Sequence, residues 1–150
     1  MPGPRADAAG WGELPLLVDT SAWARAGDSA VREQWLSVLL GDRLRISPLV
    51  RFEILLSARG GDRFNRLAEQ LDTIRPAPLT AAVVRGAEAG MRALAHRSSG
   101  SQRLPIVDYL VAAAAQELGA AVIHYDGDYD RLAEVMEFES VWMAPAGSLP

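Results

Sequence analysis

The sequence predicts an α/β protein with a central parallel sheet of four to five strands flanked by helices on both faces. Short apolar runs of strand length alternate along the chain with longer helical patterns, and turn residues separate the two. The first run, LPLLV at residues 14–18, is apolar throughout, as in strands that a parallel sheet buries on both faces. The 150 residues and 49% hydrophobic content correspond to one ordinary domain.

The first half of the chain continues this alternation. Asp28 can cap a helix that Gly41 ends, and Pro48 suits the first turn of another helix. The apolar side expected for the first of these helices consists of Val31, Trp35, Val38 and Leu39. The elements expected here are helices over residues 28–40, 48–58 and 63–74 and a strand over residues 44–46.

The second half begins with an extended connection, RPAP, after which Thr80 can cap a long helix. RSSGSQRLP, at residues 97–105, has no apolar period and is expected to be a flexible polar break. Helices are expected over residues 81–96, 106–118 and 132–136, and strands over 121–124 and 140–143. We expect one domain over residues 14–145, a flexible N-terminal tail over 1–13 and a C-terminal tail over 146–150.

Composition narrows the functional class. The net charge of -4, from 19 acids and 15 bases that are all arginine, argues against a protein that coats nucleic acid through bulk charge. The absence of cysteine excludes disulfides and thiolate metal sites. No apolar run approaches the roughly 18 residues of a membrane span, and a secretory signal is not expected. We therefore expect a soluble, cytoplasmic protein that does not enter a membrane.

One carboxylate follows the first strand directly, in LLVDTSAW at residues 16–23. Parallel sheets bind ligands beyond the carboxyl ends of their strands, so Asp19 is placed for chemistry. The alternative is a helix cap, because Asp followed by Thr and Ser is also an ordinary turn from strand to helix.

A second carboxylate is Glu53. It is the i+4 member of a helical pattern whose i, i+3 and i+7 members are Leu49, Phe52 and Leu56. It is therefore expected on an apolar stripe, where a lone buried carboxylate costs several kcal/mol. A structural ion pair with Arg51 or Arg59 is the alternative, although Arg51 projects away from Glu53 around the helix.

Further acids stand in the second half of the chain. Asp108 is the one charged residue between Ile106 and Ala115, in the first turn of a helix, where a cap is an equal alternative. The turn HYDGDYD places Asp126, Asp128 and Asp130 after a strand. A calcium hand is not expected there, because Arg131 stands where that loop needs glycine.

The positions of these acids are not independent. Asp19 and the acids of the later turn follow parallel strands at the same edge, and Glu53 and Asp108 lie on helices that must cover that sheet. Several carboxylates cannot stay ionised together without a cation, and an all-oxygen set favours Mg²⁺ or Mn²⁺. The sequence therefore predicts one metal cluster.

The motifs LLVDTSAW, RFEILLSA, IVDYLVAAAAQELGA and AVIHYDGDYDRLA occur in an order and spacing that resemble a PIN domain, in particular the VapC toxins of bacterial toxin and antitoxin pairs. The resemblance covers about residues 14–145. It implies a three-layer sandwich with a central parallel sheet and a metal-dependent ribonuclease activity.

The resemblance also implies roles for single residues. Asp19, Glu53 and Asp108 match three acidic positions of the family, and Asp126 and Asp128 both qualify for the fourth, with Asp130 as a weaker third choice. These acids would hold Mg²⁺, which Mn²⁺ can replace. Weaker candidates for contacts with RNA are Thr20, Ser21, Arg97 and Arg103.

The partners implied by the resemblance are an RNA substrate, such as transfer or ribosomal RNA, a VapB-type antitoxin and a second copy of the chain. The helices of residues 28–40 and 63–74 could supply the dimer surface, although core packing explains their apolar residues equally well. Two other functions stay open: a noncatalytic binding or scaffold protein of the same fold, and a nuclease acting on DNA. An aspartyl phosphatase is disfavoured, because Ser21 stands where a second carboxylate is needed.

Overall fold

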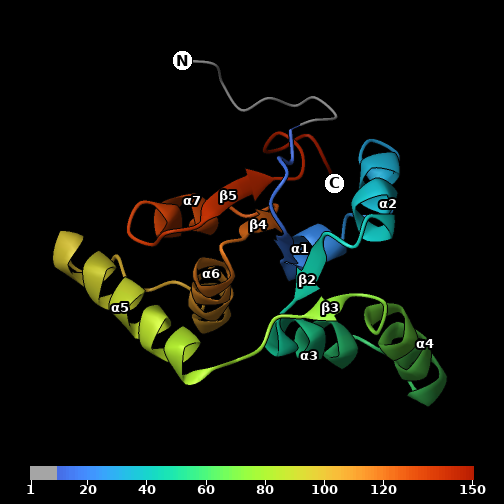
Figure 1. Ribbon diagram of the computed structural model, residues 1–150, viewed down its shortest axis with the longest axis horizontal. Helices are drawn as coiled ribbons and strands as arrows, with labels where there is room; N and C mark the ends of the chain where they lie inside the picture. The colour runs from blue at the N-terminus through green and yellow to red at the C-terminus, as the bar shows by residue number, and fades with distance from the viewer. Residues whose placement is uncertain (1–9) are drawn as a thin grey trace.

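The computed structural model describes residues 10–150, whose centre is a five-stranded, fully parallel sheet (Figure 1). The strand order is β3-β2-β1-β4-β5, and Leu16 of β1 pairs with Leu44 of β2 on one side and Ala121 of β4 on the other. The strands are β1 (Leu16–Val18), β2 (Leu44–Ile46), β3 (Arg75–Pro76), β4 (Ala121–His124) and β5 (Glu139–Trp142). The predicted parallel α/β class is confirmed, and the extended RPAP connection supplies the edge strand β3.

Helices flank this sheet. They are α1 (Thr20–Trp23), α2 (Arg32–Leu40), α3 (Pro48–Leu56), α4 (Gly61–Leu71), α5 (Ala81–Arg97), α6 (Ile106–Leu118) and α7 (Asp128–Ala133). Helix α6 packs against β1 and β4, and α5 lies along the outer side of α6 (Figure 1). Within the described part of the chain, no helix is long and apolar enough to cross a membrane.

The core forms where the strand and helix patterns predict it. The three residues of β1 are fully buried, as are Val111 and its alanine neighbours in α6. The alanines let α6 approach the sheet closely, because a methyl group takes little space between a helix and a strand. Val31, Trp35 and Val38 are buried as expected, so the predicted apolar side of α2 faces the core.

Two helix boundaries differ from the prediction. Helix α2 begins at Arg32 and not at Asp28, whose carboxylate accepts from the Ala30 N–H at 2.9 Å in a turn before the helix. The short helix expected over residues 132–136 is α7, which begins at Asp128. It starts early because Asp126 Oδ1 accepts from the Asp128 N–H, one of the free donors of the first turn.

The predicted apolar stripe of α3 is wrong. The helix buries Val50, Ile54 and Leu55, whereas Phe52 is 62% exposed and Leu56 is 86% exposed. Apolar residues cover most of this short helix, so its spacing is compatible with either side facing the core. Glu53 is exposed as well, and the expected burial of its carboxylate is corrected with the stripe.

The packed part of the chain extends beyond residues 14–145. Trp11 is buried and donates from Nε1 to the Met143 carbonyl at 3.1 Å. At the other end, the Leu149 N–H donates to the Tyr125 hydroxyl at 2.8 Å. Residues 1–9 of the expected N-terminal tail lie outside the described residues.

Gly119 ends α6 in the left-handed conformation, with φ of 63°, which costs a side chain about 1 kcal/mol. Gly119→Ala should therefore lower the free energy of unfolding by about 1 kcal/mol in urea denaturation. The matched control is Gly86→Ala in α5, where an added Cβ would lie 3.5 Å from Ala113 Cβ. Gly86→Ala should raise the free energy of unfolding by about 0.5 to 1 kcal/mol, because alanine suits a helix interior better than glycine. Equal stability of the two variants would contradict the cost assigned to the left-handed conformation at Gly119.

Candidate metal centre

The strand order places the predicted acids at one point of the sheet. β1 pairs with β2 on one side and with β4 on the other, so the connections diverge between β1 and β4. Asp19 directly follows β1, and Asp126 follows β4 by two residues. Both lie at the carboxyl edge of the sheet, at the topological switch point where open α/β sheets bind ligands.

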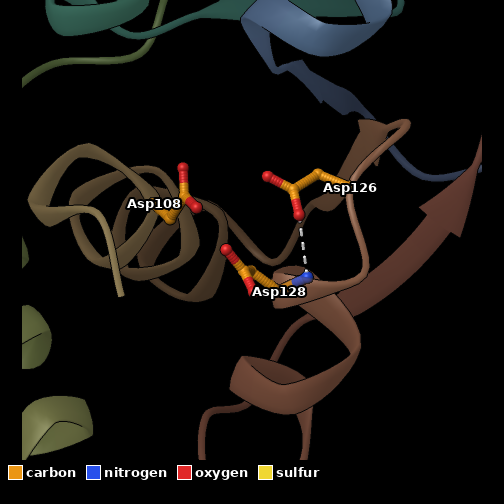
Figure 2. Close-up of side chains that lie close together, drawn as sticks. All are labelled: Asp108, Asp126 and Asp128. Carbon is orange, nitrogen blue, oxygen red and sulfur yellow. Dashed lines mark hydrogen bonds between the residues drawn. The ribbon is translucent and has the colours of Figure 1, made fainter. Parts of the chain in front are cut away.

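Three of the predicted acids form a group that we call the carboxylate cluster: Asp108, Asp126 and Asp128. One carboxylate oxygen from each lies within 4.8 Å of the other two. Figure 2 shows Asp108 on α6 facing Asp126, in the turn after β4, and Asp128, the first residue of α7. Asp126 Oδ1 also accepts from the Asp128 N–H at 3.0 Å, which fixes these two acids relative to each other.

Asp130, the third choice for the acid after β4, lies outside the carboxylate cluster. Its Oδ1 accepts from the Ser140 hydroxyl at 2.6 Å, and its Oδ2 accepts from Trp142 Nε1 at 2.8 Å. Both oxygens are therefore bonded to residues of β5. The structure brings Asp126 and Asp128 to the site together and directs Asp130 to β5.

Asp108 is the most unusual acid of the group. It is only 6% exposed, its Oδ1 accepts from the Tyr129 hydroxyl at 3.3 Å, and its buried Oδ2 has no hydrogen-bond partner among the described residues. Burial, followed by the nearby charges of Asp19 and Asp126, raises the pKa of Asp108 to about 7. Asp108 lies in the first turn of α6, as expected, but its side chain makes no capping hydrogen bond to the helix backbone.

Asp19 both caps a helix and adjoins the carboxylate cluster. Its Oδ2 accepts from the Ser21 N–H at 3.0 Å, which caps α1, and from the Ser21 hydroxyl. Its Oδ1 accepts from the Tyr129 hydroxyl at 2.7 Å. Because the same hydroxyl reaches Asp108, one O–H group stands between the two carboxylates. The helix cap considered as the alternative for Asp19 is therefore formed, next to the carboxylate cluster.

Glu53 reaches the site through a neighbour. Its Oε1 accepts from the Thr20 hydroxyl at 2.8 Å, and Thr20 is the first residue after Asp19. Arg51 pairs with Asp72 at 2.9 Å, so the structural ion pair considered for Glu53 and Arg51 is absent. Glu53 is thus exposed at the rim of the site, outside the carboxylate cluster.

The two hydroxyls predicted to contact substrate hold the site together. Besides donating to Asp19, the Ser21 hydroxyl accepts from the Tyr125 N–H at 2.9 Å and so ties α1 to the end of β4. The Thr20 hydroxyl donates to Glu53. Both are engaged within the protein.

The predicted arginines differ in availability. Arg97 pairs with Glu134 at 2.5 Å, whereas Arg103 is exposed and its side chain makes no ion pair or hydrogen bond with the part of the chain that the structure describes. Arg131 was not predicted, yet its charge opposes the effect of burial and Asp126, which raise the pKa of Asp128. Arg131 also donates to the Ser101 carbonyl at 3.1 Å.

A buried histidine supports the acidic turn and was not predicted either. The Asp126 N–H donates to His124 Nδ1 at 3.1 Å, so Nε2 carries the proton and donates to the Ser140 hydroxyl at 2.7 Å. Burial lowers the pKa of His124 to about 4, and the ring is neutral. In the sequence it only ends an apolar strand, a pattern that gives no sign of these bonds.

The donor set fits a hard divalent cation. It consists of carboxylate oxygens alone, which suit Mg²⁺ or Mn²⁺. The buried, unpartnered Asp108 Oδ2 is the kind of atom that a cation would satisfy. Without a cation, the pKa of Asp108 is raised to about 7, so a proton offsets its charge below about pH 7.

Comparison with known proteins assigns the family. The family model of the PIN domain matches residues 16–135. Ribonuclease VapC18 of Mycobacterium tuberculosis is 38% identical over 137 residues, covering 91% of this chain and 100% of the relative. Ribonuclease VapC51 of the same organism is 33% identical, covering 91% and 98%.

Solved structures agree on the fold. The DNA-bound VapBC of Salmonella typhimurium has a TM-score of 0.68 at 16% identity, covering 88% of this chain and 100% of that chain. VapBC-5 of Mycobacterium tuberculosis has a TM-score of 0.64 at 21% identity, covering 85% and 98%. These two structures show the same fold. The family model and the sequence relatives show that the chain belongs to the PIN domain family and, within it, to the VapC group.

The raised pKa of Asp108 predicts how stability depends on pH. The pKa of Asp108 is about 7 in the folded chain and 3.8 for an unperturbed aspartate, so ionisation of Asp108 disfavours folding. This lowers the free energy of unfolding increasingly from about pH 4 to about pH 7, and by the full amount above that. Asp108→Asn should thus raise the free energy of unfolding of the metal-free protein at about pH 8 by about 2 to 4 kcal/mol.

The gain from Asp108→Asn should shrink towards about pH 4, where the aspartate is protonated in both states. Urea denaturation of both proteins across this range, in the presence of a chelator, measures the difference. A variant that is less stable than the wild type at about pH 8 would contradict this assignment.

Proposed function

We propose that this protein is a Mg²⁺-dependent endoribonuclease and the toxin of a toxin and antitoxin pair. The observation that carries the proposal is the buried, unpartnered Asp108 Oδ2 beside Asp126 and Asp128 at the switch point of the sheet. RNA is proposed as the substrate because VapC18 and VapC51, two relatives above 30% identity, are both named ribonucleases.

The carboxylate cluster would hold the ion, with Asp19 next to it and Glu53 at its rim. A bound Mg²⁺ or Mn²⁺ supplies Lewis acidity, which makes water a stronger nucleophile and offsets the negative charge of a phosphodiester. The protein fixes the acids before the substrate arrives. Asp126 and Asp128 are joined by a hydrogen bond, and Asp19 is held by Ser21 and Tyr129.

The substrate would approach through local positive charge, because the chain as a whole is acidic. Arg103, in the segment before α6, is exposed and available for a phosphate. Arg131, whose charge acts on Asp128, is a second candidate. We propose transfer or ribosomal RNA as the substrate, and single-stranded loops as the cleaved regions, since unstacked bases are accessible there.

The proposed partner is a VapB-type antitoxin. Phe52 and Leu56 lie one turn apart on α3, are largely exposed, and flank Glu53 at the rim of the site. An apolar segment of the antitoxin bound there would cover the entrance to the carboxylate cluster. This assignment is supported by solved relatives that are VapBC complexes.

A homodimer is also proposed. Trp35 and Leu67 are buried in the core and are unavailable to a second copy. Leu36 and Leu40 on α2 and Phe64 on α4 are exposed on the two helices that were expected to supply the dimer surface.

Removing one acid of the carboxylate cluster tests the activity. Purified, antitoxin-free protein with Mg²⁺ or Mn²⁺ should cleave total cellular RNA, and Asp126→Asn should reduce the rate by at least about 100-fold, because a ligand charge is lost. The control Glu69→Gln removes an exposed charge from α4 and should cleave like the wild type. Sequencing of the cleaved ends identifies the RNA.

The same assay separates the two other functions. Cleavage of single-stranded or duplex DNA without cleavage of RNA would indicate a DNA nuclease. Binding of Mn²⁺ without cleavage of either polymer would indicate a noncatalytic binding protein. Equal RNA cleavage by the wild type and Asp126→Asn would contradict the proposed site.

A charge on the exposed side of α3 tests the partner surface. Leu56→Asp should weaken binding of the cognate VapB-type antitoxin by at least about tenfold, equivalent to about 1.4 kcal/mol, because a carboxylate would be desolvated in an apolar contact. Affinity for Mn²⁺ should not change. Val84→Asp on α5, an exposed apolar position on another surface, is the control for calorimetry. Equal antitoxin affinity for the two variants would show that the antitoxin does not bind the exposed side of α3.

A further inference from the structure

We infer that Tyr129 is a positioning residue of the metal centre, whose hydroxyl holds Asp19 and Asp108 in the arrangement that receives the ion. This inference rests on the proposed metal-dependent function and adds to it a residue outside the acidic set. In the sequence, Tyr129 stands between two acids of the turn and reads as an ordinary core aromatic.

The contacts of the hydroxyl carry the inference. Tyr129 lies in α7, is fully buried, and donates to Asp19 Oδ1 at 2.7 Å. The same oxygen lies 3.3 Å from Asp108 Oδ1. It thereby connects the end of β1 with the first turn of α6, two elements that are far apart in the sequence.

The electrostatics of the site require such a donor. Asp19 and Asp108 are 5% and 6% exposed, so water screens little of the repulsion between them. A phenol proton between the two carboxylates offsets part of that repulsion without bringing a full positive charge. Because the hydroxyl engages Oδ1 of Asp108, Oδ2 stays free for the ion.

The ring fixes the hydroxyl in place. It packs on His124 with centroids 4.9 Å apart and planes tilted by 30°, and it meets the edge of Phe138 at 6.5 Å. His124 in turn accepts from the Asp126 N–H. Tyr129 therefore bonds Asp19 and Asp108 through its hydroxyl, and its ring packs on His124, the residue that accepts from the Asp126 N–H.

Replacing only the hydroxyl tests this role. Tyr129→Phe keeps the ring contacts and removes the donor. The matched control is Tyr109→Phe, because Tyr109 is also buried and its hydroxyl donates to the Gln102 carbonyl at 2.7 Å and not to a carboxylate. The readout is the affinity for Mn²⁺ alone, measured by electron paramagnetic resonance at fixed pH, with melting temperature recorded for each protein.

Tyr129→Phe should bind Mn²⁺ about 10- to 100-fold more weakly than the wild type, as for other groups that orient metal ligands. Tyr109→Phe should bind as the wild type does, even if its melting temperature falls. A hydroxyl with a purely structural role predicts lower melting temperatures for both variants and unchanged affinity, which would overturn the inference. Tighter binding by Tyr129→Phe would also overturn it, since the hydroxyl would then compete with the ion for Asp19.

If Tyr129→Phe does not fold, p-aminophenylalanine at position 129 takes its place, because its N–H is a weaker donor on the same ring. The affinity for Mn²⁺ should then fall relative to the wild type, by less than for Tyr129→Phe. An unchanged affinity for Mn²⁺ would overturn the inference. Failure of the wild type to bind Mn²⁺ would overturn the proposed function together with this inference. Normal binding by the wild type with no change in the variants overturns the inference alone.

Discussion

Repulsion among the carboxylates at the end of the sheet, of which Asp19 and Asp108 are buried, governs the arrangement of the residues around them. The oxygens of Asp108, Asp126 and Asp128 approach within 4.8 Å, and Asp19 stands one hydroxyl away. Such a group is costly unless a cation, a proton or hydrogen-bond donors offset its charge. In the metal-free protein, a proton and hydrogen-bond donors offset part of this charge. The pKa of Asp108 is raised to about 7, so it holds a proton below that pH, and Asp19 accepts hydrogen bonds from Ser21 and Tyr129. The carboxylate cluster is thereby kept ready for a cation.

The fold supplies those donors from elements that have little else in common. Ser21 reaches Asp19 from α1, and its hydroxyl also accepts from the Tyr125 N–H after β4. A chain of hydrogen bonds through His124 and Ser140 ends at Asp130, so the acid that lies outside the carboxylate cluster secures the turn of the acids inside it. Hydroxyls and a neutral imidazole suit this task, because they order carboxylates without neutralising them.

The sequence predicts the sheet, the edge at which the acids meet, and the identity of the acids after β1 and β4, because strand patterns and parallel topology determine which residues follow strand ends. It fails at α3, where the apolar residues fit two orientations of the helix and only packing selects Val50 and Ile54 for the core. It also fails at Tyr129 and His124, whose surroundings read as core. The bonds of Tyr129 to Asp19 and of His124 to Ser140 join residues 110 and 16 positions apart, and no local pattern encodes such pairs.

We propose that a divalent ion binds between α6 and the turn after β4. Anomalous diffraction from crystals soaked in Mn²⁺ tests it directly, because the metal is then located without reference to activity. We expect one principal anomalous peak in contact with Asp108 Oδ2 and with a carboxylate oxygen of Asp126 or Asp128. A crystal that contains Mn²⁺ only at other positions, or none at saturating concentration, would contradict it.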